Sequence, residues 1–123
     1  MNSLSILIAD DHELVRRGIR TLFEGRPEWK ICGEAATGRE AIEKARKLGP
    51  DVVLLDITMP EKTGLEALAE IMAIDPSARV LMCSALGQES KVIESIQKGA
   101  KDFVVKPFQP AQLLEAVGKA LAA

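Results

Sequence analysis

Apolar residues gather in five short runs along the chain, and these runs predict strands. Three of them consist almost entirely of Ile, Leu and Val, as expected for strands that are buried on both faces of a parallel sheet. The run at 29–35 alternates instead, with Lys30 and Glu34 on one side, which is typical of an edge strand. The runs are SILIAD (5–10), WKICGEA (29–35), DVVLLD (51–56), RVLMCSA (79–85) and DFVVKP (102–107).

Between the runs, and after the last one, the apolar period becomes helical. Asp11 is placed to cap the first helix, and Thr37 with Glu40 and Thr63 with Glu66 form capping-box patterns. Strands that alternate with helices in this way predict a (βα)₅ domain with helices on both faces of the sheet. The predicted apolar helix faces carry Val15, Ile19 and Leu22; Ala41, Ala45 and Leu48; Leu65, Leu68 and Met72; Val92, Ile93 and Ile96; and Leu113, Leu114, Val117 and Leu121.

Composition narrows the class of protein. The 123 residues fit one domain, and 47% apolar and 28% charged residues are typical of a globular chain. A net charge of −2 argues against a sequence-independent grip on nucleic acid. Cys32 and Cys83 lack metal-ligand spacing, which favours reduced thiols in a cytoplasmic protein. The N-terminal apolar run is too short for a signal peptide or a membrane span.

Polar residues follow the apolar runs where the strands of such a sheet end. Because ligands of open α/β sheets bind beyond the carboxyl ends of the strands, these side chains should meet at one edge. Adjacent carboxylates repel, by roughly 4 kcal/mol at about 4 Å and an effective dielectric near 20, so a cation should lie among them. Mg²⁺ prefers such oxygen ligands, and a lysine can offset part of the charge without it. The residues are Asp10, Asp11, Asp56, Ser84 and Lys106.

This set of side chains is suited to phosphoryl transfer. An aspartate can act as the nucleophile and form an acyl phosphate. The metal and the ammonium then neutralise the transferred group, while a hydroxyl fixes one of its oxygens.

At these positions the chain resembles the receiver domains of response regulators in two-component signalling. The motifs are "ADD" (9–11), "LLDITMPEKTG" (54–64), "CSA" (83–85) and "VVKPF" (104–108), in that order. The resemblance covers nearly the whole chain and implies one receiver domain over residues 1–123. It also implies a flavodoxin-like, doubly wound sheet of five parallel strands in the order 2-1-3-4-5.

The resemblance also assigns the site residues. It implies that Asp56 accepts the phosphoryl group and that Mg²⁺ is the cofactor. Asp11 would bind the metal directly, Asp10 mainly through water, Asp56 through its carboxylate and Thr58 through its backbone carbonyl. No other cofactor-binding residues are implied.

For the response to phosphorylation, the resemblance implies that Ser84 and Lys106 contact the phosphoryl group. Phe103 occupies the aromatic switch position, and its ring would turn inward when the Ser84 hydroxyl moves toward the phosphate. The bond between Lys106 and Pro107 is expected to be cis.

The implied function is a phosphorylation-activated signalling switch and not a metabolic enzyme. Its partners would be a sensor histidine kinase or phosphotransfer protein, and an output domain or protein that reads strands 4–5 and helices 4–5. We expect a cytoplasmic monomer that can dimerise when phosphorylated, with no direct contact to membrane or nucleic acid. The stretch at 10–24 is similar to receivers with helix-turn-helix outputs, and the stretch at 84–110 to stand-alone chemotaxis-type receivers.

Two other functions fit the sequence less well. A Mg²⁺-dependent phosphohydrolase of the haloacid-dehalogenase type would need a second aspartate where the chain has Thr58. A flavodoxin-like electron carrier would need a Ser/Thr/Gly-rich phosphate loop where the chain has DDHE (10–13). His12 is interpreted as a surface or capping residue, and Arg16 and Arg17 as a solvated face paired with Glu13.

Overall fold

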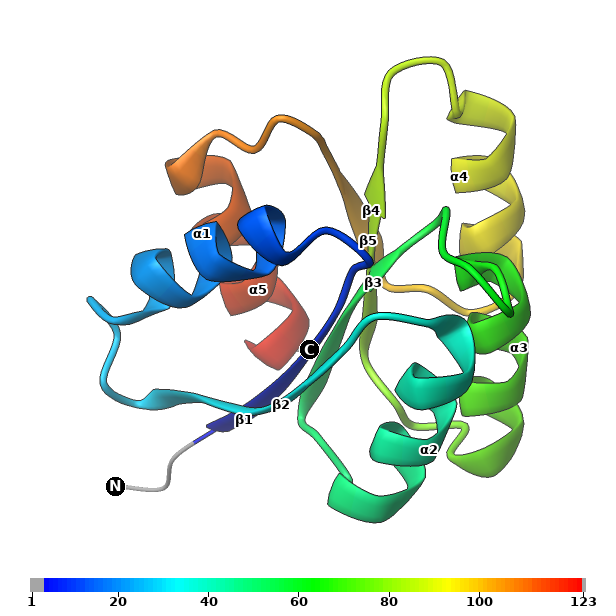
Figure 1. The fold of residues 1–123 in the computed structure, drawn as a ribbon, viewed down its shortest axis with the longest axis horizontal. Helices are drawn as coiled ribbons and strands as arrows, with labels where there is room; N and C mark the ends of the chain where they lie inside the picture. Colours follow the sequence, from blue (N-terminus) through cyan, green and yellow to red (C-terminus); the bar gives the residue numbers. More distant parts are fainter. Residues whose placement is uncertain (1–3, 123) are drawn as a thin grey trace.

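The computed structural model describes residues 4–122, in which strands and helices alternate from end to end (Figure 1). No helix in this part of the chain is long and apolar enough to cross a membrane. The elements are β1 (Leu4–Ala9), α1 (Glu13–Phe23), β2 (Trp29–Ala35), α2 (Gly38–Leu48), β3 (Val52–Asp56), α3 (Gly64–Ile74), β4 (Val80–Ser84), α4 (Glu89–Gln97), β5 (Asp102–Val105) and α5 (Pro110–Ala122).

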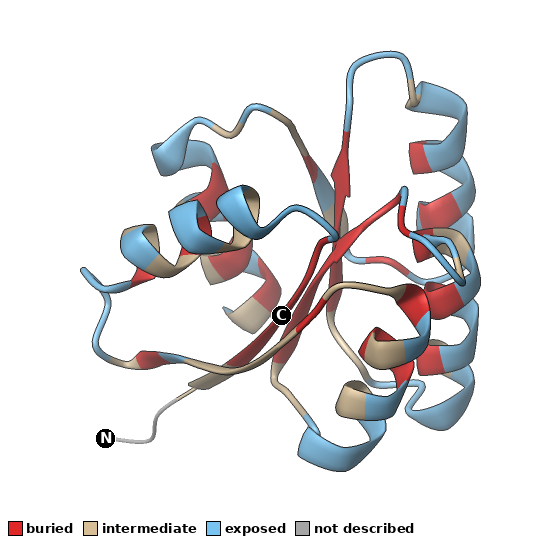
Figure 2. Cartoon of the chain, in the orientation of Figure 1, coloured by how far each residue is buried: buried red, intermediate tan, exposed pale blue. Residues whose placement is uncertain are grey.

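All strand pairs are parallel, and the sheet has the order β2-β1-β3-β4-β5. Helices α1 and α5 cover one face, while α2, α3 and α4 cover the other (Figure 1). The buried positions lie on the central strands and on the helix sides that face them (Figure 2). The predicted doubly wound (βα)₅ fold is confirmed.

Burial along the strands follows the sequence pattern. Every residue of β3 and β4 is buried, as the unbroken apolar runs predicted. Strand β2 lies at an edge, but its alternation is interrupted. The register shifts so that Ile6 pairs with Ile31 and Leu7 pairs with Gly33, which leaves Cys32 outside the pairing. A bulge of this kind bends an edge strand locally.

The predicted helix starts are confirmed in one case and corrected in two. Thr63 and Glu66 form the full capping box, with bonds of 3.2 and 3.0 Å. Thr37 accepts the Glu40 N–H as predicted, but the Glu40 carboxylate accepts from the Ala36 N–H instead of returning to Thr37. The prediction that Asp11 caps α1 is wrong. His12 occupies the N-cap position, and its side chain makes no capping hydrogen bond.

The fourth helix departs from the sequence prediction in the width of its buried face. Val92 is buried, but Ile93 and Ile96 are exposed. Helix α4 covers the β4 side of the sheet, next to the short strand β5, and so buries only a narrow stripe. The predicted apolar face therefore lies partly on the surface of the protein.

Candidate functional site

The polar residues predicted to meet at the carboxyl edge do meet there. Asp10 directly follows β1, Asp56 ends β3, Ser84 ends β4 and Lys106 directly follows β5. Asp10 is 2% exposed, Asp56 5% and Ser84 2%, so this polar group is held within the protein. Four separate strands therefore bring their ends to one small site.

The ammonium of Lys106 lies between two of the carboxylates. Its Nζ is 2.5 Å from Asp10 Oδ2 and 3.2 Å from Asp56 Oδ2. Burial by itself lowers the pKa of Lys106, but the hydrogen bond to Asp10 and the charges of Asp56 and Asp10 outweigh it, and the pKa is raised. The lysine therefore stays charged and compensates part of the carboxylate repulsion, as the sequence predicted.

Asp56 is the carboxylate whose environment disfavours its charge. Burial raises its pKa above the ordinary value, against the opposing charge of Lys106, and the charge of Asp10 raises it further. A backbone hydrogen bond from Thr58 also acts on this carboxylate and lowers its pKa. A buried carboxylate with a raised pKa is more basic, and hence a better nucleophile, than one in water.

The acidic residues can hold a cation. One ligand atom from each of Asp10, Asp11, His12 and Asp56 lies within 4.8 Å of the others. Two members of the group are buried and two are exposed, so the cluster opens to solvent on one side. Three carboxylates with an open side fit Mg²⁺, which takes few protein oxygens and keeps several waters.

His12 lies closer to the acidic cluster than the sequence indicated. It occupies the N-cap of α1, and its side chain is exposed, as predicted. Its backbone N–H donates to Asp10 Oδ1 at 2.8 Å, and its Nδ1 is 3.1 Å from Asp11 Oδ1. The residue therefore helps to orient the two carboxylates.

The loop after β3 is held tightly against Asp56. The Gly64 N–H donates to Ile57 O at 2.7 Å. A Cβ atom at Gly64 would lie 2.0 Å from the backbone oxygen of Asp56, so only glycine fits at the start of α3. Thr58 lies in this loop, beside the phosphoacceptor candidate, where the prediction placed it.

The two predicted switch residues lie apart. Ser84 Oγ is buried and donates a long bond of 3.5 Å to Val104 O. The Phe103 side chain lies on the surface, with 41% exposure. A pocket of about 220 Å³ lies between them and is lined by both. The Lys106–Pro107 bond is cis, as predicted.

Two polar residues make contacts at the site that the sequence did not predict. Arg16 was expected to pair with Glu13, but its Nη1 donates to the backbone oxygen of Asp10 at 2.5 Å and its Nε to Glu34 at 3.0 Å. Gln88 joins the loops after β3 and β4 through its side-chain amide. The Arg16–Glu34 and Gln88–Thr58 contacts have no periodic signal, because each links residues that only the fold brings together.

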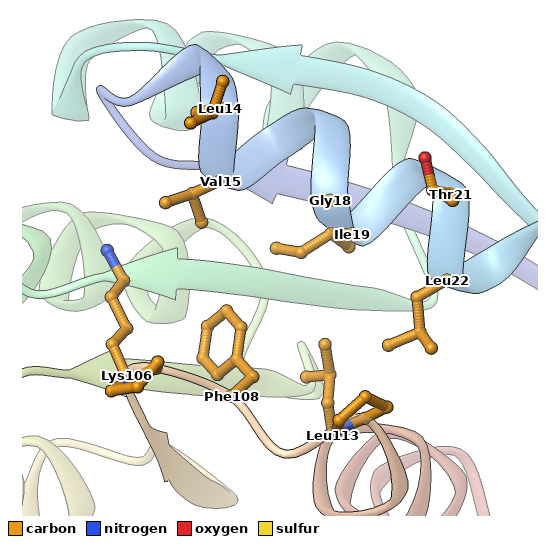
Figure 3. A pocket seen from close by; sticks show the side chains of 11 residues that line it. Leu14, Val15, Gly18, Ile19, Thr21, Leu22, Lys106, Phe108 and Leu113 are labelled. Carbon is orange, nitrogen blue, oxygen red and sulfur yellow. The ribbon is translucent and has the colours of Figure 1, made fainter.

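The site opens into a pocket of about 360 Å³. A larger apolar pocket of about 590 Å³ adjoins it between α1 and the start of α5. Figure 3 shows Phe108 and Leu113 facing Ile19 and Leu22 across this space, with Lys106 at one end. The smaller pocket is lined by Asp11, His12, Val15, Asp56, Thr58, Ala85, Gln88 and Lys106, and it shares Val15 and Lys106 with the larger one.

Comparison with known proteins identifies the family. Residues 6–118 match the family described as the response regulator receiver domain. The chain therefore belongs to the response regulator receiver domains of two-component signalling, which confirms the resemblance found in the sequence.

Several relatives are chemotaxis proteins. The chain is 52% identical to the chemotaxis protein CheY of Listeria monocytogenes over 117 residues, which is 95% of this chain and 98% of that protein. It is 49% identical to CheY of Thermotoga maritima over 114 residues, covering 93% of this chain and 94% of that one. The CheX–CheY–BeF₃–Mg²⁺ complex of Borrelia burgdorferi has a similar structure, with a TM-score of 0.90, 38% identity, and coverage of 96% of this chain and 89% of that one.

Proposed function

We propose that Asp56 accepts a phosphoryl group from the phosphohistidine of a sensor kinase or phosphotransfer protein, or from a small acyl phosphate. The observation that carries the proposal is the position of this buried carboxylate. It lines an open pocket, 3.2 Å from the Lys106 ammonium and within reach of two further carboxylates. The chain's membership of the receiver family supports the same role for Asp56.

In the transfer, one carboxylate oxygen of Asp56 forms a bond to phosphorus as the P–N bond of phosphohistidine, or the P–O bond of the acyl phosphate, breaks. The leaving group keeps the electron pair of the broken bond. Lys106 neutralises charge on the phosphoryl oxygens, and the Ser84 hydroxyl donates a hydrogen bond to one of them. Water later returns Asp56 to the carboxylate and releases inorganic phosphate.

Mg²⁺ is the proposed cofactor of this step. Asp11 and Asp56 would hold it directly through carboxylate oxygens, and Asp10 mainly through water. Thr58 would add its backbone carbonyl. When bound, the metal offsets the mutual repulsion of the carboxylates and the charge of the incoming phosphoryl group. The Borrelia burgdorferi relative, whose structure contains BeF₃ and Mg²⁺, supports this assignment.

The donor protein is proposed to dock on α1 and the loop before α5. The apolar pocket there is continuous with the acid pocket through Val15 and Lys106 (Figure 3). Leu14 lines this pocket and is 77% exposed, although it is a large apolar side chain. An apolar surface beside the histidine of the donor would cover these side chains while the histidine reaches Asp56.

The surface formed by α4, β5 and α5 is proposed to transmit the phosphorylation signal to an output partner. A phosphoryl group would draw the Ser84 hydroxyl away from Val104, which vacates space that Phe103 can enter from the surface. The exposed side chains of Ile93, Ile96 and Phe103 on this side form a surface that an output protein or a second copy could cover. The chain thus acts as a signalling switch, and its chemistry serves its own carboxylate instead of a metabolic substrate.

Intact-mass spectrometry after incubation with acetyl phosphate tests the proposal. The wild type should gain one phosphoryl group in the presence of Mg²⁺ and none in EDTA. Asp56→Asn should gain none under either condition, because an amide is a poor nucleophile. Asp51→Asn is the matched control, since Asp51 lies at the opposite end of β3 and bonds to Ser5. A mass gain that survives in Asp56→Asn would refute the assignment.

A further inference from the structure

Gln88 connects two loops beside the proposed phosphoacceptor. It is the N-cap residue of α4, but its side chain makes no capping bond to the helix. Instead its Oε1 accepts the backbone N–H of Ala85 at 2.7 Å, and its Nε2 donates to Thr58 Oγ1 at 3.0 Å. One side chain therefore ties the loop after β4 to the loop after β3.

Both ends of this connection reach the phosphoacceptor pocket. Ala85, Thr58 and Gln88 line the same pocket as Asp56. In the β3–β4 pairing, Asp56 is the register partner of Cys83, so Ala85 lies only two residues beyond that partner. The Ala85 N–H is thus a backbone donor at the edge where Asp56 ends.

A phosphoryl group on Asp56 would bring three strong acceptor oxygens into this pocket. The donors there are already engaged. Lys106 bonds to Asp10 and Asp56, Ser84 to Val104 O, and the Ala85 N–H to the Gln88 amide. The Ser84 bond is long at 3.5 Å, whereas the Ala85 bond at 2.7 Å is short, so the amide bond is the stronger obstacle.

We propose that Gln88 is a positioning residue that competes with the phosphoryl group for the Ala85 N–H, and thereby lowers the affinity of the site for a tetrahedral anion. The inference rests on the proposed function. A charge-assisted bond from Ala85 to a phosphoryl oxygen is stronger than a neutral bond to an amide, so the exchange is favourable once the anion is present. Gln88 then leaves Ala85, and the tie between the two loops opens.

Beryllofluoride, which imitates the phosphoryl group on Asp56, measures this competition. In the presence of Mg²⁺, Gln88→Met should bind beryllofluoride about three- to tenfold more tightly than the wild type, because one neutral hydrogen bond no longer has to break. Methionine keeps the length of the side chain without its polar groups. Isothermal titration calorimetry of the full chain provides the affinities.

Two further variants separate competition from a general effect on α4. Gln88→Glu keeps an acceptor for the Ala85 N–H and adds a negative charge, so it should bind beryllofluoride more weakly than the wild type. Gln97→Met makes the same chemical change as Gln88→Met at the exposed last residue of α4, and should bind like the wild type.

The amide resonance of Ala85 gives a readout that a merely structural role would not move. Without beryllofluoride, the wild type and Gln88→Met should differ at this amide, since only the wild type has the Gln88 acceptor. With beryllofluoride bound, the two should coincide, because the same anion then accepts the Ala85 N–H in both. Tighter binding together with this convergence supports the proposal.

The outcomes that would overturn the inference are distinct from those that would overturn the proposed function. If Gln88→Met binds with wild-type affinity, or if the Ala85 amides still differ when beryllofluoride is bound, Gln88 does not compete and the inference is wrong, although Asp56 remains the phosphoacceptor. If the wild type binds no beryllofluoride, the proposed function fails and the inference fails with it.

Discussion

The two sides of the site differ in how firmly their polar groups are fixed. On the β1–β2 side, the Glu34 carboxylate accepts hydrogen bonds from Arg16 and Arg20. The backbone oxygen of Glu34 accepts a hydrogen bond from Lys44. Arg16 also holds the backbone oxygen of Asp10. On the β4–β5 side, Ser84 makes one long hydrogen bond of 3.5 Å, and Phe103 is 41% exposed beside a pocket.

This difference suits a switch. The carboxylates proposed to hold Mg²⁺ have to stay in place whether or not Asp56 carries a phosphoryl group, and the ion pairs of β2 anchor the strand next to them. On the β4–β5 side, the side chains of Ser84 and Phe103 have few contacts to lose and a pocket of about 220 Å³ to fill, so a rearrangement of these two side chains costs little. Lys106 and Asp56 lie where the two sides meet.

The largest effect is expected where the two sides share a charge. Lys106→Met leaves Asp10 and Asp56 facing each other without a cation, so the free energy of unfolding should fall by about 3 kcal/mol in EDTA. Mg²⁺ should restore more stability to this variant than to the wild type, because it replaces the missing positive charge. Urea unfolding with EDTA and with Mg²⁺ measures both quantities. A variant that is as stable as the wild type in EDTA would contradict the compensating role of Lys106.

A smaller loss in the free energy of unfolding is expected on the β1–β2 side. Glu34→Gln removes the charge that holds Arg16 and Arg20, and should lower the free energy of unfolding by about 2 kcal/mol. Glu61→Gln is the matched control, because the Arg39–Glu61 pair is exposed and should contribute less than about 0.5 kcal/mol. Urea unfolding of both variants tests the contrast. Equal losses would mean that β2 is not anchored by this network.

The sequence predicted the elements of the site that lie at strand ends. An apolar strand followed by Asp10 or Asp56 is visible in the chain, and the parallel topology then brings those residues together. The Arg16–Glu34 pair could not be predicted in this way, since it joins a helix to a neighbouring strand 18 residues away. Helical spacing suggested Glu13 as the partner, but Arg16 pairs with the partly buried carboxylate of Glu34 instead.

Helix α4 shows the same limit for apolar residues. Its period identified the helix but not the width of the face that the sheet covers. Ile93 and Ile96 are exposed because α4 lies beside β5, a strand of only four residues at the edge of the sheet. Hydrophobic spacing indicates that a side chain is apolar, whereas neighbouring elements decide whether it is covered.

The pH dependence of stability should sharpen the role of Asp56. Its raised pKa means that the folded protein binds a proton more tightly than the unfolded chain, so without metal the stability falls as the pH rises from about 3.9 through the folded-state value. The Asp56→Asn variant has no carboxyl group at this position, so this fall in stability with rising pH should be absent from it. At neutral pH in EDTA the variant should therefore be more stable than the wild type, because the amide that replaces the carboxyl group carries no charge that burial disfavours.

Unfolding of the wild type and Asp56→Asn in EDTA from pH 3 to pH 7 provides the check. The stability difference should be smallest at the acidic end, where the wild-type carboxyl is protonated in both states. A difference that shrinks as the pH rises would contradict burial as the dominant influence on Asp56.

The smallest effect on stability is expected on the β4–β5 side, at Phe103, whose proposed role is in the response to phosphorylation. Phe103→Ala removes a side chain that is 41% exposed and only partly covered, so the free energy of unfolding should fall by about 1 kcal/mol. The response to beryllofluoride should nevertheless shrink, because no ring remains to fill the pocket that Ser84 vacates.

In wild-type NMR spectra, amide shifts should extend from the loops around Asp56 through residues 84–104. In Phe103→Ala they should stay near the loops, while Phe108→Ala, on the α1–α5 side, should keep the wild-type pattern. A full wild-type pattern in Phe103→Ala would mean that the ring follows the rearrangement without supporting it.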